Sequence, residues 1–591
     1  MKQMLYQLKI ILTEKQRKGL FFLFLGAVFN ASLDTIAVAL MAPFMSVLTN
    51  LGGFEESAIG IVMAAYFNVN SKEQALIILS AGFILLYLVR GISKIIYNSV
   101  QARMMADYRT DLSIRLFSFI MNKPYSFHLK HNTSETQRLV NGDVHNCFAA
   151  LNSLLSTMSC LFVSSGIFAV LLFMNWKLTM LLLIIVAFFV VWAKRVLKNI
   201  IKRYADMSYT ANGEIYKWVS QAIGGLKNIL VKHREAYYVD QYSFYAKNAA
   251  KANSNYIAID LMPKVLIDTA CMVLVFATVL IEVLVGNDIN SSLPMFATFA
   301  LAAMRLIPVA NSLTSTMNQL SFYRPSLDAV ISMMENGQVE ANVDARILAA
   351  EESKAGLDEH KVLTKGIELF DISFKYDDAE TWLYNDLNLY IPARKSVAFI
   401  GTTGSGKTTL ADIILGLHKP LTGKVLADGI DISENSIWWS TMLGYIPQFV
   451  YLSDDTIRAN VALGEKREAI DDVWVWSCLE KAHMKEFVES LPDGLDTVTG
   501  ENGVRLSGGQ RQRIGIARAL YCKPQFLVMD EATSSLDGET EKMIVESINA
   551  ISKDITILII AHRLSTIENC DMVYRIEDGK SILERTEKLS Q

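Results

Sequence analysis

Apolar residues are concentrated in the first half of the chain, where they form six long stretches. A helix that crosses a bilayer needs about 20 predominantly apolar residues, and each stretch meets that length. The six stretches are 19–48, 74–103, 146–174, 177–197, 260–286 and 293–321. Several of them exceed the thickness of a membrane, so we expect their helices to continue beyond it. The pattern predicts an all-α membrane domain of six spans over residues 1–336.

Two polar segments between these stretches keep a helical period. In 104–145 and 198–259, Leu, Ile, Phe and Tyr recur at helical spacing. Turn-like sequences interrupt them at Lys123–Phe127 and Ala222–Gly225. Each segment is therefore predicted to be a pair of helical extensions closed by a short turn.

The distribution of basic residues predicts the orientation. Lys and Arg are frequent before residue 19 and in both helical extensions, whereas 49–73 contains one Lys and 287–292 contains neither residue. Loops rich in Lys and Arg stay in the cytosol, so we expect both termini and both extensions to be cytosolic. The apolar external segment 49–73 is too short to span alone and is expected to lie in the interface as an amphipathic helix.

The second half of the chain has a different pattern. After a polar linker at 337–364, residues 365–591 show short strand-like apolar runs and amphipathic helices, as in an α/β protein. The formal net charge of −4 and the lack of a long basic run give no indication of a nucleic-acid partner. The 6 cysteines form no CxxC pair, which argues against a metal site or a disulfide framework.

A glycine-rich loop follows the strand-like run 396–400 and precedes a helical pattern. Its sequence matches GxxxxGK[ST] in the strand–loop–helix context of a P-loop, where backbone N–H groups and a helix N-terminus surround phosphate. Lys407 is expected to reach the β- and γ-phosphates of ATP, and Thr408 to bind Mg²⁺. The predicted nucleotide-binding residues of the loop are Gly401, Thr402, Thr403, Gly404, Ser405, Gly406, Lys407, Thr408 and Thr409.

Two further motifs complete this prediction. The apolar run 526–529 ends in Asp530, expected to hold Mg²⁺, and Glu531, expected to orient the attacking water. Between this run and the P-loop lies a second anion-binding turn, composed of Ser507, Gly508, Gly509 and Gln510. The P-loop already provides the phosphate cradle of this chain. A second anion-binding turn is therefore explained if it covers the nucleotide bound to another subunit.

Residues 365–580 resemble the ATP-binding cassette family. The resemblance implies that Tyr376 stacks on adenine, that Gln448 senses Mg²⁺ and the membrane domain, and that His562 contacts the γ-phosphate. It identifies 506–510 as the family signature and 534–537 as the D-loop. Residues 497–503 match only partly the exporter loop usually written TEVGERG. Glu531 and the signature are intact, which favours a homodimer with two competent ATP sites.

The whole chain resembles exporters of this family, with six spans before the cassette in one polypeptide. The membrane half is similar to bacterial flippases of lipid-linked oligosaccharides used in protein glycosylation. This resemblance implies a multi-pass protein of the cell inner membrane. It also implies that a polyprenyl-pyrophosphate glycan moves from the cytosolic to the outer leaflet.

Three cations within the spans are candidates for binding such an anionic cargo, because buried charge in a membrane is costly and often functional. They are Arg90, Lys264 and Arg305. The alternative is that they form ion pairs, for example with Asp34 or Asp268, and hold helices together.

Two other functions remain open at this stage. One is export of drugs, lipids or peptides on the same scaffold, which an apolar cavity without functional cations would favour. The other is a gated channel or regulator that uses the cassette as a nucleotide switch. A degenerate Glu531 or signature would favour this switch, and the sequence shows neither.

Overall fold

The computed structural model describes residues 9–40, 44, 72–174, 176–285, 307–335, 362–377, 379–531, 555–561, 567 and 570–585. They group into two compact units. The first comprises Met1–Lys123 and His128–Val343, and the second comprises Pro124–Phe127 and Asp344–Gln591. The predicted linker at 337–364 lies almost wholly outside the described residues.

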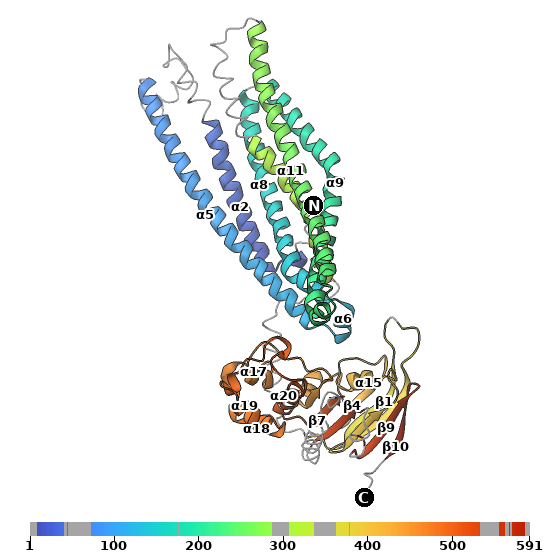
Figure 1. Cartoon of the computed structure of the whole chain (residues 1–591). Helices are drawn as coiled ribbons and strands as arrows, with labels where there is room; N and C mark the ends of the chain where they lie inside the picture. The colour runs from blue at the N-terminus through green and yellow to red at the C-terminus, as the bar shows by residue number, and fades with distance from the viewer. Residues whose placement is uncertain are drawn as a thin grey trace. The chain divides into compact units, whose positions relative to one another are not determined.

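The first unit consists of long helices (Figure 1). Its main helices are α2 (Glu14–Ala39), α5 (Lys72–Met121), α8 (Val144–Met174), α9 (Trp176–Gly224), α11 (Glu235–Val285) and α13 (Arg324–Glu335), and residues 307–322 are also helical. Helices α5, α9 and α11 have 50, 49 and 51 residues, which is about 75 Å at 1.5 Å per residue. They are more than twice as long as a bilayer core is thick, so each is long enough to continue beyond a membrane.

Both predicted turns are present. Helix α5 ends at Met121 and is followed by the short helices α6 (Tyr125–Lys130) and α7 (Thr133–Gln137). Helix α9 ends at Gly224, and α10 (Leu226–Val231) connects it to α11. A feature that the sequence pattern did not predict is a π-helical turn, η2 (Arg138–Asp143), directly before α8.

Among the described residues, three segments are long and apolar enough to cross a membrane by length and composition. They are Glu14–Ala37, Glu73–Met121 and Thr133–Val170. The fourth predicted span lies within α9 and the fifth, except for its last residue, within α11. Only the second part of the sixth span, from residue 307, is described, and the interfacial helix expected at 49–73 falls almost entirely outside the described residues.

The second unit contains two sheets. An antiparallel sheet has the order β2-β1-β4-β5, and a second sheet has the order β10-β9-β3-β8-β7-β6. In the second sheet, β3 pairs in parallel with β8 and β9, and β7 pairs in parallel with β6 and β8. The strands are β1 (Gly366–Phe374), β2 (Tyr384–Pro392), β3 (Ser396–Ile400), β4 (Thr422–Ala427), β5 (Ile430–Asp431), β6 (Leu443–Ile446), β7 (Phe526–Asp530), β8 (Thr556–Ile560), β9 (Met572–Glu577) and β10 (Lys580–Arg585).

Continuous apolar runs form the centre of the parallel sheet, because both of its faces are covered. Every residue of β7 and β8 is buried. One apolar cluster joins the two sheets to α15 (Lys407–Ile414), and another packs β7 and β8 against α18 (Asp472–Lys481) and α20 (Gly508–Tyr521). The carboxyl ends of parallel strands lie at one edge of a sheet, so the loop after β3 and the acids at the end of β7 share that edge.

Candidate functional site

The loop between β3 and α15 has the backbone of a phosphate cradle. Gly401, Gly404 and Gly406 have φ values of 145°, 86° and 100°, a region that suits glycine. A Cβ on Gly406 would lie 2.2 Å from the Tyr384 hydroxyl. That hydroxyl donates a hydrogen bond to the Gly406 carbonyl at 2.5 Å. Tyr384, which the sequence analysis missed, therefore fixes the last turn of the loop.

The side chains of this loop fit the phosphates of ATP. Lys407 is 5% exposed, and its Nζ donates to the carbonyls of Gly401 and Thr402 at 2.9 Å each. Burial lowers the Lys407 pKa, and the charges of Glu531 and Asp530 oppose that shift. The Ser405 hydroxyl is buried and has no hydrogen-bond partner among the described residues. A buried cation and an unpaired donor in one cradle are what a bound polyphosphate requires.

The acidic side of the site is formed where β7 ends. Asp530 is buried, and Glu531 follows it with a left-handed φ of 48°. Gln448, two residues beyond β6, donates from Nε2 to Glu531 Oε2 at 2.6 Å. The amide oxygen of Gln448 is an acceptor and is suited to binding a cation. The structure thus brings Gln448, which follows β6, to Glu531 at the end of the paired strand β7, directly after Asp530.

Asp412 is a second acid near Asp530 that the sequence analysis did not select. Burial, together with the charge of Asp530, raises the pKa of Asp412 to about 6. Asp412 lies four residues after Thr408 in α15, so both residues face the same side of the helix. Helical spacing from the P-loop was the signal that could have identified it.

Tyr376 lies beside the P-loop helix. Its hydroxyl is 2.9 Å from the Thr409 hydroxyl, and its ring centroid is 5.3 Å from that of Phe374. The ring is exposed. An exposed aromatic ring at the first turn of α15 is suitably placed for stacking on a base, and that role remains a prediction.

The Ser-Gly-Gly-Gln turn forms the N-terminus of α20. The Ser507 hydroxyl accepts from the Gln510 N–H at 3.2 Å, and the Gln510 side chain accepts from the Ser507 N–H at 2.8 Å. This capping box fixes the first turn. Ser507 and Gly508 remain exposed, as a surface that contacts a ligand of another subunit requires. His562 and the D-loop at 534–537 lie outside the described residues.

The structure pairs both described cations of the predicted cargo set with carboxylates. Arg90 on α5 forms an ion pair with Asp34 on α2. Lys264 contacts Asp260 one helical turn earlier, at 2.9 Å. Asp260 also accepts hydrogen bonds from Ser315 and Asn318. These contacts agree with the alternative that the cations hold helices together, and Arg305 lies outside the described residues.

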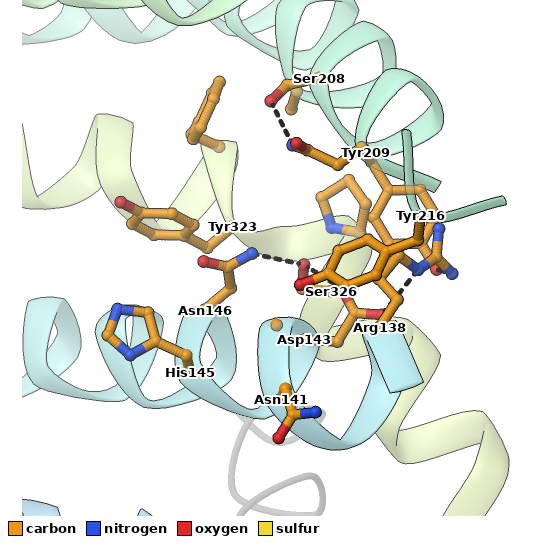
Figure 2. A pocket seen from close by; sticks show the side chains of 15 residues that line it. Arg138, Asn141, Asp143, His145, Asn146, Ser208, Tyr209, Tyr216, Tyr323 and Ser326 are labelled. Carbon is orange, nitrogen blue, oxygen red and sulfur yellow. Dashed lines mark hydrogen bonds and ion pairs between the residues drawn. The ribbon is translucent and has the colours of Figure 1, made fainter. Parts of the chain in front are cut away.

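A polar cavity of about 270 Å³ lies beside the π-helical turn, between α8, α9 and the start of α13 (Figure 2). Asp143 accepts from the Ser326 hydroxyl at 2.8 Å and lies 3.3 Å from Arg138 Nε. Arg138 also donates to the Tyr209 hydroxyl at 2.7 Å. Asp143 and Ser326 are buried. The ion pair lies within the π-helical turn, and its hydrogen bonds to Tyr209 and Ser326 connect this turn to α9 and α13, which sequence spacing alone did not reveal.

Comparisons with known proteins agree with both units. Residues 384–534 match the family model described as ABC transporter, and 19–301 match the ABC transporter transmembrane region. An ATP-dependent lipid A-core flippase of Photorhabdus laumondii is 29% identical over 97% of this chain and 93% of its own length. One from Coxiella burnetii is 29% identical over 84% of this chain and 82% of its own length. In fold, a bacterial Atm1-family ABC exporter with ATP bound has a TM-score of 0.75 at 21% identity, covering 96% of this chain and 95% of that chain.

Proposed function

Because this chain belongs to the ABC transporter family, as a half-transporter that joins a transmembrane region to an ATP-binding domain, we propose that it is an ATP-driven lipid flippase. We propose further that its cargo is a polyprenyl-pyrophosphate-linked oligosaccharide, which it moves from the cytosolic to the outer leaflet of the inner membrane. The main support is that the nucleotide-site motifs are intact and that the chain is similar, over 84% and 97% of its length, to two proteins named ATP-dependent lipid A-core flippase.

The residues at the nucleotide site divide the chemistry between them. Lys407 would contact the β- and γ-phosphates, and Thr408 and Asp530, assisted by Gln448, would hold Mg²⁺, which neutralises developing phosphate charge. Glu531 would accept a proton from the attacking water. The bond from Gln448 holds the Glu531 carboxylate in one orientation. This bond is the observation on which the catalytic assignment mainly rests.

The working unit is proposed to be a homodimer. The exposed capping box at Ser507 would cover the nucleotide bound to the P-loop of a second copy. Two ATP molecules would then lie between the two ATP-binding domains. Closure of the two ATP-binding domains on ATP, and their separation after hydrolysis, would change access to the cavity that holds the cargo. Both termini would lie in the cytosol.

Export of a more apolar cargo is the second candidate. Arg90 and Lys264 are already neutralised by carboxylates. In addition, a groove of about 510 Å³ between α2 and α5 is lined mainly by apolar side chains such as Phe22, Phe29 and Ile96. This groove favours a hydrophobic portion in the cargo, whether or not a glycan is attached.

The test is ATPase turnover of the purified protein in phosphatidylcholine nanodiscs, with and without a polyprenyl-pyrophosphate oligosaccharide. We expect the lipid to stimulate turnover and the labelled lipid to reach the outer leaflet in ATP-dependent fashion in liposomes. Normal basal turnover without any response would leave the ATPase assignment intact and favour the drug, lipid or peptide exporter.

A further inference from the structure

Arg109, on the second half of α5, is a cation without a carboxylate partner among the described residues. Its Nη1 lies 3.0 Å from Nδ1 of His145 near the start of α8. A guanidinium can only donate, so His145 Nδ1 must accept, and the neutral ring carries its proton on Nε2. The pair therefore presents only N–H donors to its surroundings. Arg90 and Lys264 differ, since each has its own carboxylate.

Arg109 and His145 line a groove of about 420 Å³ between α5 and α8. Three amide side chains, Asn98, Gln101 and Asn152, line the same groove, and Gln101 donates to Asn152 at 2.6 Å. The described lining residues include no Asp or Glu. A guanidinium, an imidazole N–H and amides without competing carboxylates match the acceptor oxygens of a phosphate or diphosphate.

The contrast with the cavity in Figure 2 supports this choice. There, Arg138 forms an ion pair with Asp143 and donates to Tyr209, so its charge already has a carboxylate partner. In the α5–α8 groove, the described lining residues include no carboxylate that would neutralise the charge of Arg109. Compared with the cavity beside the π-helical turn, this groove is the one whose arginine has no carboxylate among the described lining residues.

The position of the groove along the helices identifies the source of that anion. The second predicted span ends at residue 103 and the third begins at 146, so Asn98 to Arg109 on α5 and His145 to Asn152 on α8 both straddle the predicted cytosolic edge of the membrane. Lipid headgroups of the cytosolic leaflet lie at that level. We propose that the Arg109–His145 groove binds the phosphate or diphosphate headgroup of the lipid cargo before it is moved, an assignment that rests on the proposed flippase function.

The test compares Arg109→Gln with Arg103→Gln in the full-length protein in phosphatidylcholine nanodiscs. Arg103 is on the same helix, is exposed and does not line the groove, so its substitution makes the same charge change nearby. The probe is undecaprenyl pyrophosphate, with undecaprenol and inorganic pyrophosphate as separate arms. We expect binding of the lipid pyrophosphate to weaken about tenfold in Arg109→Gln, the loss typical of one charge-assisted hydrogen bond. Arg103→Gln should bind as the wild type does.

A second substitution, His145→Gln, removes the imidazole and should also weaken lipid binding, while basal ATPase activity reports that each variant is folded. Equal weakening by Arg109→Gln and Arg103→Gln would overturn the groove assignment, because only general charge would then matter. Unchanged binding in Arg109→Gln, or equal affinity for undecaprenol, would also overturn it. Equally tight binding of inorganic pyrophosphate would overturn the lipid source. A wild type that binds none of these lipids but hydrolyses ATP normally would count against the flippase function itself.

Discussion

At the scale of single residues, the bond between Gln448 and Glu531 separates two functions of the nucleotide site. Glu531 accepts a hydrogen bond from Gln448 Nε2. Lys407 is held separately, by hydrogen bonds to carbonyls of the P-loop. Nucleotide binding and hydrolysis should therefore respond differently to substitution. A neutral amide in place of the carboxylate can still accept from Gln448 but cannot take a proton from water.

Glu531→Gln should lower ATP turnover by about 100-fold or more, as expected for loss of a general base, and leave ATP affinity nearly unchanged. Turnover is measured by phosphate release and affinity by binding of a fluorescent ATP analogue. Lys407→Ala is the matched comparison, because it should weaken nucleotide binding itself. Sustained hydrolysis in Glu531→Gln would sink the catalytic assignment.

His418 should make the stability of the second unit depend on pH. Its ring is 5% exposed and lies near Phe374 and Tyr376, and burial lowers its pKa below 6.5. The unfolded chain takes up this proton at a higher pH than the folded chain. The contribution of neutral His418 to the stability of the fold is therefore fully present above pH 6.5. It is lost as the pH falls through that value towards the pKa of His418 in the folded chain.

We expect His418→Phe to reduce the drop in melting temperature between pH 7.5 and pH 5.5. The measurement is thermal unfolding of the full-length protein at both pH values. His483→Asn serves as a control, because His483 is exposed and at a left-handed φ of 52° that Asn tolerates. An equal pH response in wild type and His418→Phe would contradict the expectation.

At the scale of elements, the π-helical turn before α8 depends on a buried ion pair. Asp143 contacts both Arg138 from the same turn and Ser326 from α13. Gly213 on α9 leaves space for Arg138, because a Cβ there would lie 2.7 Å from Nη1. Removing one member of such a pair leaves an uncompensated charge in the interior.

Asp143→Ala should destabilise the first unit by about 3–5 kcal/mol, the usual cost of breaking a buried pair. Replacing both members, as in Asp143→Leu/Arg138→Met, should recover much of that loss. The measurement is thermal unfolding in nanodiscs, followed by a probe in the membrane half. A single variant as stable as the wild type would show that the pair does not hold this junction together.

At the scale of the whole molecule, each ATP site is expected to use two copies of the chain. Mixed dimers provide a test of this arrangement. In a dimer of one Lys407→Ala subunit and one Ser507→Arg subunit, both substitutions fall in the same composite site. The second site then contains an unchanged P-loop and an unchanged signature.

We expect this mixed dimer to occlude about one nucleotide, and each homodimeric variant to occlude almost none. The measurement is retention of radiolabelled ATP by differently tagged, co-purified subunits carrying Glu531→Gln to prevent turnover. Equal retention by the Ser507→Arg homodimer and by the protein with an unchanged signature would show that Ser507 does not cover a partner's nucleotide.

Sequence alone was sufficient for the division into a helical membrane half and an ATP-binding half, and for the position of the P-loop. The turns after Met121 and at Gly224 were predicted where the structure has them, because apolar periodicity and turn residues are local signals. The P-loop was predictable for the same reason, since contiguous backbone forms most of the cradle. Asp530 and Gln448 follow strands of one parallel sheet, so motif order already implied their proximity.

Tertiary structure decided how the charges are used. Sequence could not show that Arg90 meets Asp34, 56 residues away, because that contact depends on how α2 and α5 are rotated against each other. The π-helical turn and its Arg138–Asp143 pair depend on packing among α8, α9 and α13. Likewise, Arg109 differs from other arginines only through its surroundings in the fold. Helix α8 places His145 beside it, and the described residues that line the groove include no carboxylate. A charge is read from the sequence, but its partner is fixed by packing.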